Sequence, residues 1–217
     1  MVIKAFPSPD TADEYGLVAI GGDLDVESLV LAYSSGIFPW PVADEAVLTW
    51  FSPPERAVLF LDRVRVSKSL GKEFQQTTLK FFIDKDTEKV IQECASLTNR
   101  KEDGTWITNE IRKAYVAFHK AGYCHSVSCY DGEELVGGLY GVSINGMFAG
   151  ESLFYRKPNA SKLCLLYLIE YLRQKGVRWI DCQQMTPLLE SFGAVELSRE
   201  EFLDMLEQEV SKDISLF

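Results

Sequence analysis

Two polar side chains share one apolar, strand-like segment near the end of the chain. Asp181 and Gln183 are two residues apart in Val177–Gln183, so in an extended strand both point to the face that Trp179 also occupies. A carboxylate there can orient the amide, whose oxygen can then accept a hydrogen bond from an amine. Such a pair would suit the attack of a neutral amine on an ester. Spacing alone favours a simpler role, in which Asp181 caps the following loop.

A third polar group, Glu151, lies in the apolar segment Met147–Tyr155. Asn145-Gly146 is a strong signal for a type I′ hairpin turn just before it. A carboxylate on an apolar face costs several kcal/mol if unpaired, so Glu151 needs a partner or a cationic ligand. The turn would place Glu151 on one face with Met147 and Leu153. It would also pair Val142 with Ala149, Gly141 with Gly150, and Tyr140 with Glu151. The two facing glycines would leave a notch where a ligand could approach the backbone.

Two tryptophans lie in loop-like segments and not in periodic core segments. Trp40 ends GIFPW and Trp106 lies in GTWIT. A tryptophan in a loop can stack on a nucleobase. Covering the edge of the core is an equally good interpretation of either residue.

Composition excludes several other classes of protein. The chain has 217 residues, 47% of them hydrophobic, and a net charge of −10, which argues against general nucleic-acid binding. It holds no apolar run long enough for a membrane span, and its first residues lack the apolar core of a secretion signal. Five cysteines without a CxxC pair suggest reduced thiols and a cytoplasmic protein. His119 and His125 have no partner at metal-ligand spacing.

Hydrophobic periodicity predicts an α+β protein. We expect a small N-terminal lobe over residues 1–94 and a second domain over residues 95–217, with three consecutive antiparallel strands at its centre. Predicted helices are Asp25–Tyr33, Ser67–Phe74, Asp86–Ala95, Thr108–Lys120 and Asn159–Gln174, with a final helix opened by a capping box at Ser198–Glu201. Predicted strands are Ala57–Leu61, Leu79–Ile83, His125–Tyr130, Glu134–Ser143, Met147–Tyr155 and Val177–Gln183.

Seven motifs in a fixed order resemble the bacterial leucyl/phenylalanyl-tRNA–protein transferases. They are FPSPDTADEYGLVAIGGDLDVESLVLAYSSGIFPW, LTWFSPPERAVL, GTWIT, GGLYGV, FAGESLF, NASK and IDCQ, and they cover the chain from about Phe6 to about Leu206. The resemblance implies an aminoacyltransferase with a GNAT-like acyltransferase domain. It would move leucine, phenylalanine or, less well, methionine from aminoacyl-tRNA to an N-terminal arginine or lysine, marking the acceptor for N-end rule degradation. No metal and no cofactor are implied, and we expect a monomer.

The resemblance also implies roles for individual residues. Asp181 and Gln183 of IDCQ match the proposed catalytic pair, and Glu151 of FAGES matches a glutamate that helps to hold the acceptor. In this family the proton of the acceptor amine is taken up either with the help of these side chains or with the help of a ribose hydroxyl of the tRNA's terminal adenosine. Tyr33, Trp40 and Trp106 match residues that receive the terminal adenosine or support activity. Leu139, Leu153, Leu165 and Ile180 match the pocket for the transferred side chain, and Arg63, Arg65, Lys68 and Lys72 match a basic region facing the acceptor stem.

Some residues depart from the family pattern and keep alternatives open. Leu188 stands in TPLLESFGA where the family usually has a histidine, and Ser128 stands in HSVSCY where it usually has an acidic residue. These changes suggest an altered acceptor preference, or an adaptor that binds basic N-termini without catalysis. An acyl-CoA acetyltransferase is disfavoured, because YRKPNASK has no glycine where such enzymes hold a pyrophosphate.

Overall fold

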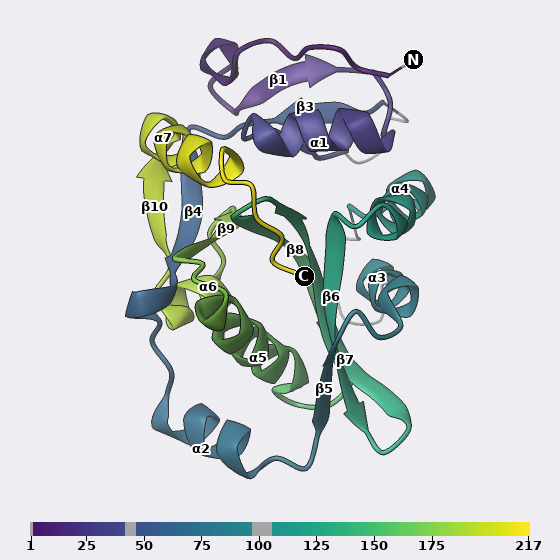
Figure 1. Ribbon diagram of the computed structural model, residues 1–217, viewed down its shortest axis with the longest axis vertical. Coiled ribbons are helices and arrows are strands. Elements are labelled where there is room, and N and C mark those ends of the chain that lie inside the picture. The colour runs from purple at the N-terminus through teal and green to yellow at the C-terminus, as the bar shows by residue number, and fades with distance from the viewer. Residues whose placement is uncertain (1, 42–46, 97–105) are drawn as a thin grey trace.

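A seven-stranded sheet forms the body of the protein, and a three-stranded sheet lies beyond one end of it (Figure 1). The structure is a computed structural model that describes residues 2–41, 47–96 and 106–217. The large sheet has the order β10-β4-β9-β8-β7-β6-β5 and the small one β1-β3-β2. The strands are β1 Leu17–Ile20, β2 Phe38–Pro39, β3 Thr49–Phe51, β4 Glu55–Phe60, β5 Lys80–Ile83, β6 Cys124–Asp131, β7 Glu134–Ile144, β8 Met147–Tyr155, β9 Trp179–Gln183 and β10 Val195–Ser198.

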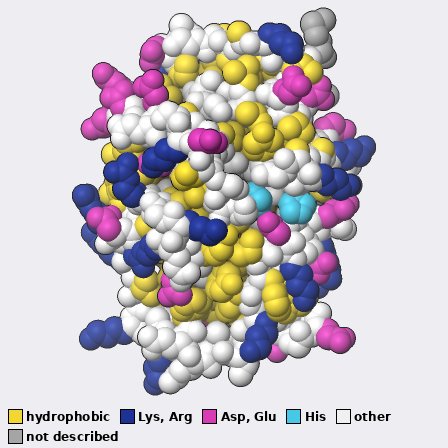
Figure 2. Space-filling model, viewed as in Figure 1, with side chains coloured by type: hydrophobic (Ala, Val, Ile, Leu, Met, Phe, Trp, Pro, Cys, Tyr) yellow, Lys and Arg dark blue, Asp and Glu magenta, His cyan; other side chains and the backbone are white. Residues whose placement is uncertain are grey.

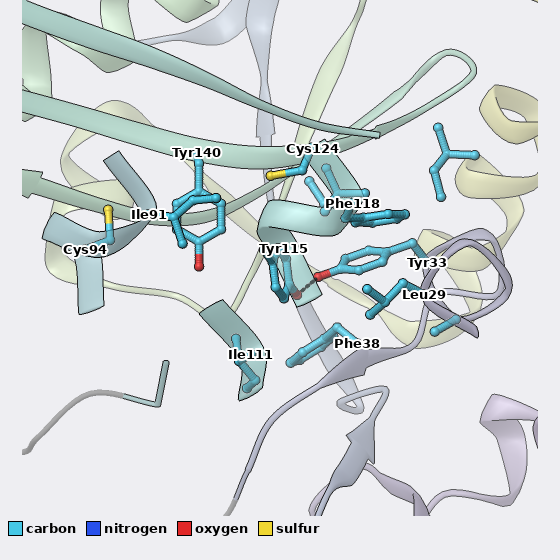
Figure 3. Close-up of a cluster of buried hydrophobic side chains, with 14 of the residues drawn as sticks. Leu29, Tyr33, Phe38, Ile91, Cys94, Ile111, Tyr115, Phe118, Cys124 and Tyr140 are labelled. Carbon is cyan, nitrogen blue, oxygen red and sulfur yellow. Dashed lines mark hydrogen bonds between the residues drawn. The ribbon is translucent and has the colours of Figure 1, made fainter. Parts of the chain in front are cut away.

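Helices cover both faces of the large sheet. One face carries α5, which packs on β6, β7 and β8, and the other carries α3 and α4. The helices are α1 Val26–Ser34, α2 Lys68–Gln76, α3 Thr87–Ala95, α4 Asn109–Lys120, α5 Ala160–Gln174, α6 Pro187–Phe192 and α7 Arg199–Val210, with short 3₁₀ turns at Pro9–Thr11 and Leu61–Arg63. Two apolar clusters result. The first holds Tyr33, Tyr115 and Tyr140 (Figure 3), and the second holds the leucines of α5.

The predicted α+β class is confirmed, with a mostly antiparallel sheet flanked by helices. The predicted helices and strands occur within about two residues of their expected bounds, and the capping box at Ser198 and Glu201 is present. β1, β2, β3, α6 and β10 had no counterpart in the prediction. A domain boundary at residue 94 stays a prediction. β4 and β5, which precede that residue, pair within the seven-stranded sheet.

The hairpin of β7 and β8 carries a bulge at Glu151. Gly141 faces Gly150 as predicted, but Tyr140 faces Ser152, so the expected pair of Tyr140 with Glu151 is wrong. Glu151 is the extra residue, and an extra residue reverses the alternation of the strand beyond it. Met147 accordingly packs in the first cluster and Leu153 in the second, so the predicted common face of Glu151 and Leu153 is also wrong.

The decisive feature of the sheet is the contact between β8 and β9. It is the parallel junction of the large sheet, and a single pair of residues, Ala149 and Asp181, makes it. Every other neighbouring pair of strands in the large sheet is antiparallel and registered over four or more positions. Beyond Ala149 and Asp181 no further pairing joins the described parts of the two strands. The sheet therefore opens between β8 and β9.

The two facing glycines should differ in their tolerance of a side chain. A Cβ on Gly141 would lie 2.3 Å from the carbonyl oxygen of Ala149 and 2.4 Å from the Phe148 ring. A Cβ on Gly150 would have its nearest neighbour, the carbonyl oxygen of Asp181, at 3.8 Å. We expect Gly141→Ala to lower the free energy of unfolding by about 1–3 kcal/mol, and Gly150→Ala to change it little. Urea unfolding of both variants tests this, and equal losses would contradict it.

Candidate active site

The opening between β8 and β9 contains a cavity of about 460 Å³. Its wall draws on both faces of the sheet, because Tyr140 and Phe154 belong to the first cluster while Leu139 and Leu165 belong to the second. Glu151 and Gln183 line it from the two diverging strands. The cavity therefore passes between strands where an ordinary sheet would be closed by backbone hydrogen bonds.

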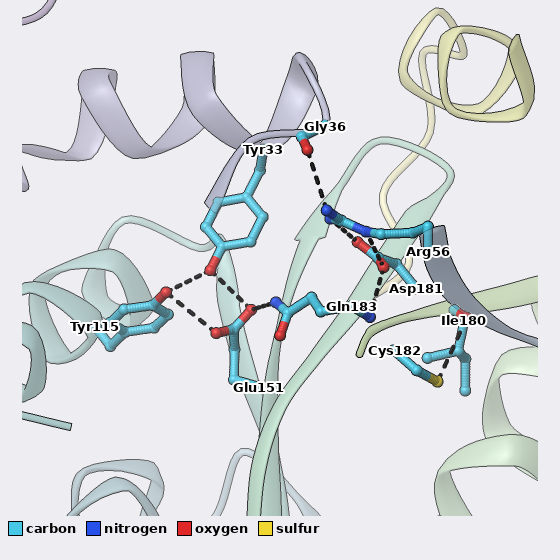
Figure 4. A network of polar contacts seen from close by, with 9 residues as sticks. All are labelled: Tyr33, Gly36, Arg56, Tyr115, Glu151, Ile180, Asp181, Cys182 and Gln183. Carbon is cyan, nitrogen blue, oxygen red and sulfur yellow. Dashed lines mark hydrogen bonds and ion pairs between the residues drawn. The ribbon is translucent and has the colours of Figure 1, made fainter. Parts of the chain in front are cut away.

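A hydrogen bond between side chains bridges this opening (Figure 4). The amide nitrogen Nε2 of Gln183 donates to Oε1 of Glu151 at 2.8 Å. The hydroxyl of Tyr33 donates to the same oxygen at 2.7 Å, and the hydroxyl of Tyr115 donates to Oε2 at 3.2 Å. The two tyrosine hydroxyls are also in contact with each other, and since each has one proton, all three contacts are hydrogen bonds at once only when Glu151 is protonated. Glu151 is thus held from three elements, and it in turn fixes the amide of Gln183.

The orientation of the Gln183 amide follows from this bridge. Because Nε2 faces Glu151, the oxygen Oε1 is turned away, and among the described residues no hydrogen bond to that oxygen is seen (Figure 4). Gln183 has a left-handed backbone, with φ of 61°, at the end of β9. The arrangement offers a fixed carbonyl oxygen in the cavity wall, which can accept a hydrogen bond from an amine.

The carboxylate of Asp181 does not orient the side-chain amide of Gln183. It holds the backbone at the end of β9, close to the capping role that spacing alone favoured. Its Oδ1 accepts from the backbone nitrogen of Gln183 at 2.9 Å, while Glu151 binds the side chain. Asp181 is 2% exposed and is absent from the cavity wall. The carboxylate fixes the turn that carries Gln183, so the geometry gives it a positioning role.

Arg56 is the partner of Asp181, and sequence reasoning missed it. Its Nε and Nη2 donate to the two carboxylate oxygens at 2.8 and 2.7 Å, and its Nη1 donates to the carbonyl of Gly36 at 3.2 Å. The guanidinium lies between the rings of Phe38 and Phe202, 4.7 and 4.5 Å from their centres. The signal that could have revealed it is Arg56 itself, next to the apolar run AVLF. A buried arginine is rare unless it is paired, so its position directly before a predicted core strand implies a buried acidic partner.

Burial raises the pKa of Glu151 to about 7, although the hydrogen bonds from Tyr33, Gln183 and Tyr115 work against the rise and the charge of Asp181 adds to it. Burial, and then the charge of Glu151, raise the pKa of Tyr33 and of Tyr115 well above the usual value. Both tyrosines therefore remain protonated donors. Glu151 therefore changes charge near neutral pH.

The apolar part of the cavity contains all four residues predicted for the side-chain pocket. Leu139, Leu153, Leu165 and Ile180 line it. Leu188, one of the two departures from the family pattern, lines it as well. Ser128, the other departure, is buried in β6, where its hydroxyl donates to the carbonyl of Phe82 at 3.5 Å, and it is absent from the wall.

The predicted adenosine contacts separate in space. Trp40 and Trp106 both line the cavity and stack on each other, with ring centres 5.4 Å apart and planes 17° apart. Tyr33 is 2% exposed and is absent from the cavity wall, and its hydroxyl donates to Glu151 from within the core. Its position fits support of Glu151 and not direct contact with a nucleoside.

The four predicted basic residues lie outside the wall of this cavity, on the segment that runs from Arg63 into α2. Arg63 lines a second cavity with Arg173 and Arg178, whereas Lys72 lines a shallow hollow on α2. Arg65 packs near Gly193, and Lys68 begins α2. Figure 2 shows Lys and Arg side chains along the left edge of the molecule, where Figure 1 places the segment from β4 to α2.

Other chemistries find little support in the described residues. Burial raises the pKa of the Cys182 thiol in the cavity wall, which disfavours a thiolate nucleophile. In the described parts of the chain, no three His, Cys, Asp or Glu side chains come together as a metal site would require. No described helix is both long and apolar enough to cross a bilayer.

Two segments that together cover most of the chain match models of one protein family. Residues 58–207 match the family described as leucyl/phenylalanyl-tRNA protein transferase, and residues 22–54 match the N-terminal domain of the same family. A protein of this description from Pseudoalteromonas atlantica is 46% identical over 94% of this chain and 88% of its own length. Another from Flavobacterium johnsoniae is 44% identical over 93% and 94%. Among solved structures, L-PGS from Bacillus licheniformis has a TM-score of 0.47 at 14% identity, over 86% of this chain and 70% of that one.

The pKa of Glu151 makes stability depend on pH. The folded pKa of about 7 exceeds the usual 4.5, so the folded state holds a proton that the unfolded state has lost between these values. Stability should therefore be greatest below the unfolded pKa and should fall as pH rises to about 7, by roughly 2–3 kcal/mol. We expect Glu151→Gln to remove this component. Thermal unfolding of both proteins from pH 5 to 8 tests it, and a difference that stays constant over this range would contradict it.

Proposed function

This chain belongs to the leucyl/phenylalanyl-tRNA–protein transferase family and is an aminoacyltransferase that uses aminoacyl-tRNA as donor, and from that premise we propose the acceptor and the site. The acceptor is a protein whose first residue is arginine or lysine, and the product carries leucine, phenylalanine or, less readily, methionine ahead of it. Such a product would enter N-end rule degradation. We place the reaction in the cytoplasm, where aminoacyl-tRNA is made, and propose that the enzyme acts as a monomer.

The donor side chain is proposed to enter the apolar part of the cavity. Leu139, Leu153, Leu165 and Ile180 supply a wall without charge. Burial of apolar groups contributes about 0.8 kcal/mol per methylene, which favours leucine and phenylalanine over small or polar side chains. Differences of that size select only about 10–200-fold, so methionine would be a poorer substrate but not an excluded one.

The single observation that carries the catalytic proposal is the Glu151–Gln183 bridge. It presents the Gln183 oxygen to the cavity, where it can accept a hydrogen bond from the acceptor amine and aim the nitrogen lone pair at the ester carbonyl. A carbon–nitrogen bond then forms, and the bond from the carbonyl carbon to the ribose oxygen breaks. The amine proton ends on that ribose oxygen. Because the ester is already activated, positioning is the main task of the protein.

Other parts of the site are assigned to the RNA and to support. Trp40 and Trp106, which stack at the cavity wall, are proposed to receive the terminal adenosine. Arg63, Arg65, Lys68 and Lys72 would contact phosphates of the acceptor stem, with an affinity that falls as salt rises. Asp181, Tyr33 and Tyr115 hold Gln183 and Glu151 in place.

Gln183→Ala is the sharpest test of this site. Asp181→Ala would leave Arg56 buried without its partner and would therefore confuse catalysis with stability. We expect Gln183→Ala to lower transfer of labelled leucine to an Arg-initiated peptide by about 100-fold, as loss of one transition-state hydrogen bond commonly does, with tRNA binding unchanged. Gln174→Ala, at the exposed end of α5, is the matched control.

Four peptides beginning with Arg, Lys, Asp or Ala complete the assay. Transfer to the Arg and Lys peptides supports the proposed acceptor. Transfer to the Asp peptide would show that the site, with Leu188 in its wall, has a different preference. Peptide binding without transfer would indicate an adaptor.

A further inference from the structure

A second carboxylate lines the same cavity at a distance from the Glu151–Gln183 bridge. Glu93 lies near the C-terminal end of α3, and its side chain is 18% exposed. The guanidinium of Arg156 is seated on it, with Nε–Oε2 and Nη2–Oε1 distances of 3.1 and 2.7 Å. Because Arg156 is half exposed, a cationic ligand could take its place on Glu93.

The described part of the cavity wall carries formal charges of one sign. Among the described residues that line it, Glu93 and Glu151 carry the only formal charges. Glu151 accepts a hydrogen bond from Gln183, the residue proposed to hold the reacting amine. Arg156, which binds Glu93, comes directly after Tyr155, the last residue of β8. Tyr155 is four residues beyond Glu151, which corresponds to about 13 Å along the strand at ~3.3 Å per residue. The side chain of Glu93 and a long cationic side chain of a ligand held at Glu151 can together cover a distance of that size.

A buried hydroxyl in the same wall has no hydrogen-bond partner among the described residues. Tyr140 lines the cavity, and its hydroxyl is buried without a hydrogen bond to any described residue. Figure 3 shows its ring beside Ile91 and Cys94 of α3, the helix that also carries Glu93. An unsatisfied buried hydroxyl destabilises a fold, so its retention in a cavity wall suggests a partner supplied by a ligand.

We propose that Glu93 and Tyr140 bind the cationic side chain of the first residue of the acceptor. Glu93 accepts N–H groups of the guanidinium or ammonium in the way that it accepts those of Arg156, and Tyr140 accepts one through its hydroxyl oxygen. Arg156 then competes with the acceptor for Glu93. Each carboxylate then contacts a different group of the acceptor. The α-amine lies at Glu151 and Gln183, and the side chain lies at Glu93. This assignment rests on the proposed acceptor class.

Steady-state transfer of leucine to Arg-, Lys- and Ala-initiated peptides tests the role of Glu93. We expect Glu93→Gln to raise KM for the Arg and Lys peptides about 10-fold, the usual scale for loss of a charge-assisted hydrogen bond, with kcat within about 2-fold. Glu88→Gln, an exposed residue of the same helix, should change neither constant. Arg156→Met should lower KM for both peptides, because it removes the competitor.

Tyr140→Phe separates ligand binding from folding. Removal of an unpartnered hydroxyl should raise the melting temperature, and loss of the contact with the acceptor should raise KM for the Arg peptide. A role in stability alone cannot produce that combination. Wild-type protein that fails to transfer to any Arg or Lys peptide would overturn the proposed function. Wild-type transfer with KM unchanged in Glu93→Gln and Tyr140→Phe would overturn this inference alone.

Discussion

The structure depends on the way β8 and β9 meet at one residue pair and then part. A parallel contact through Ala149 and Asp181 alone leaves the sheet open beyond it, and the opening becomes a cavity that reaches from one apolar layer to the other. The bulge at Glu151 adds to this geometry, because it turns the carboxylate toward Tyr33 and Tyr115 while Leu153 faces the leucines of α5. An apolar pocket and a polar bridge therefore lie side by side in one opening.

Two buried carboxylates near this opening have opposite surroundings. Asp181 is neutralised by the bidentate contact with Arg56, which aromatic rings enclose on both sides. Glu151 has only neutral donors around it, so burial moves its pKa to about 7. A cation that enters the cavity would favour the ionised form of Glu151, and the negative wall would in turn favour a cationic acceptor. The net charge of −10 is consistent with such a substrate.

Local signals in the sequence predicted much of the fold. Asn145-Gly146 located the hairpin, Thr108 and Ser198 located helix starts, and period two located the strands. The side-chain pocket came from the family resemblance, and its four residues do meet in one cavity, although their role stays a proposal. The bulge at Glu151, the ion pair of Arg56 with Asp181 and the parting of β8 from β9 were not predicted. The ion pair and the parting of the strands depend on contacts between residues far apart in the chain, which no local pattern encodes. The bulge lies in a local hairpin, but its carboxylate is held by the distant Tyr33 and Tyr115.

A crystal structure of the protein with a leucyl amide of 3′-amino-adenosine, in which an amide replaces the labile ester, would locate the donor site directly. We expect the leucyl side chain to lie among Leu139, Leu153 and Ile180, its carbonyl to face Gln183, and the adenine to contact Trp40 or Trp106. A leucyl group bound outside the opening between β8 and β9 would show that this opening is not the donor site.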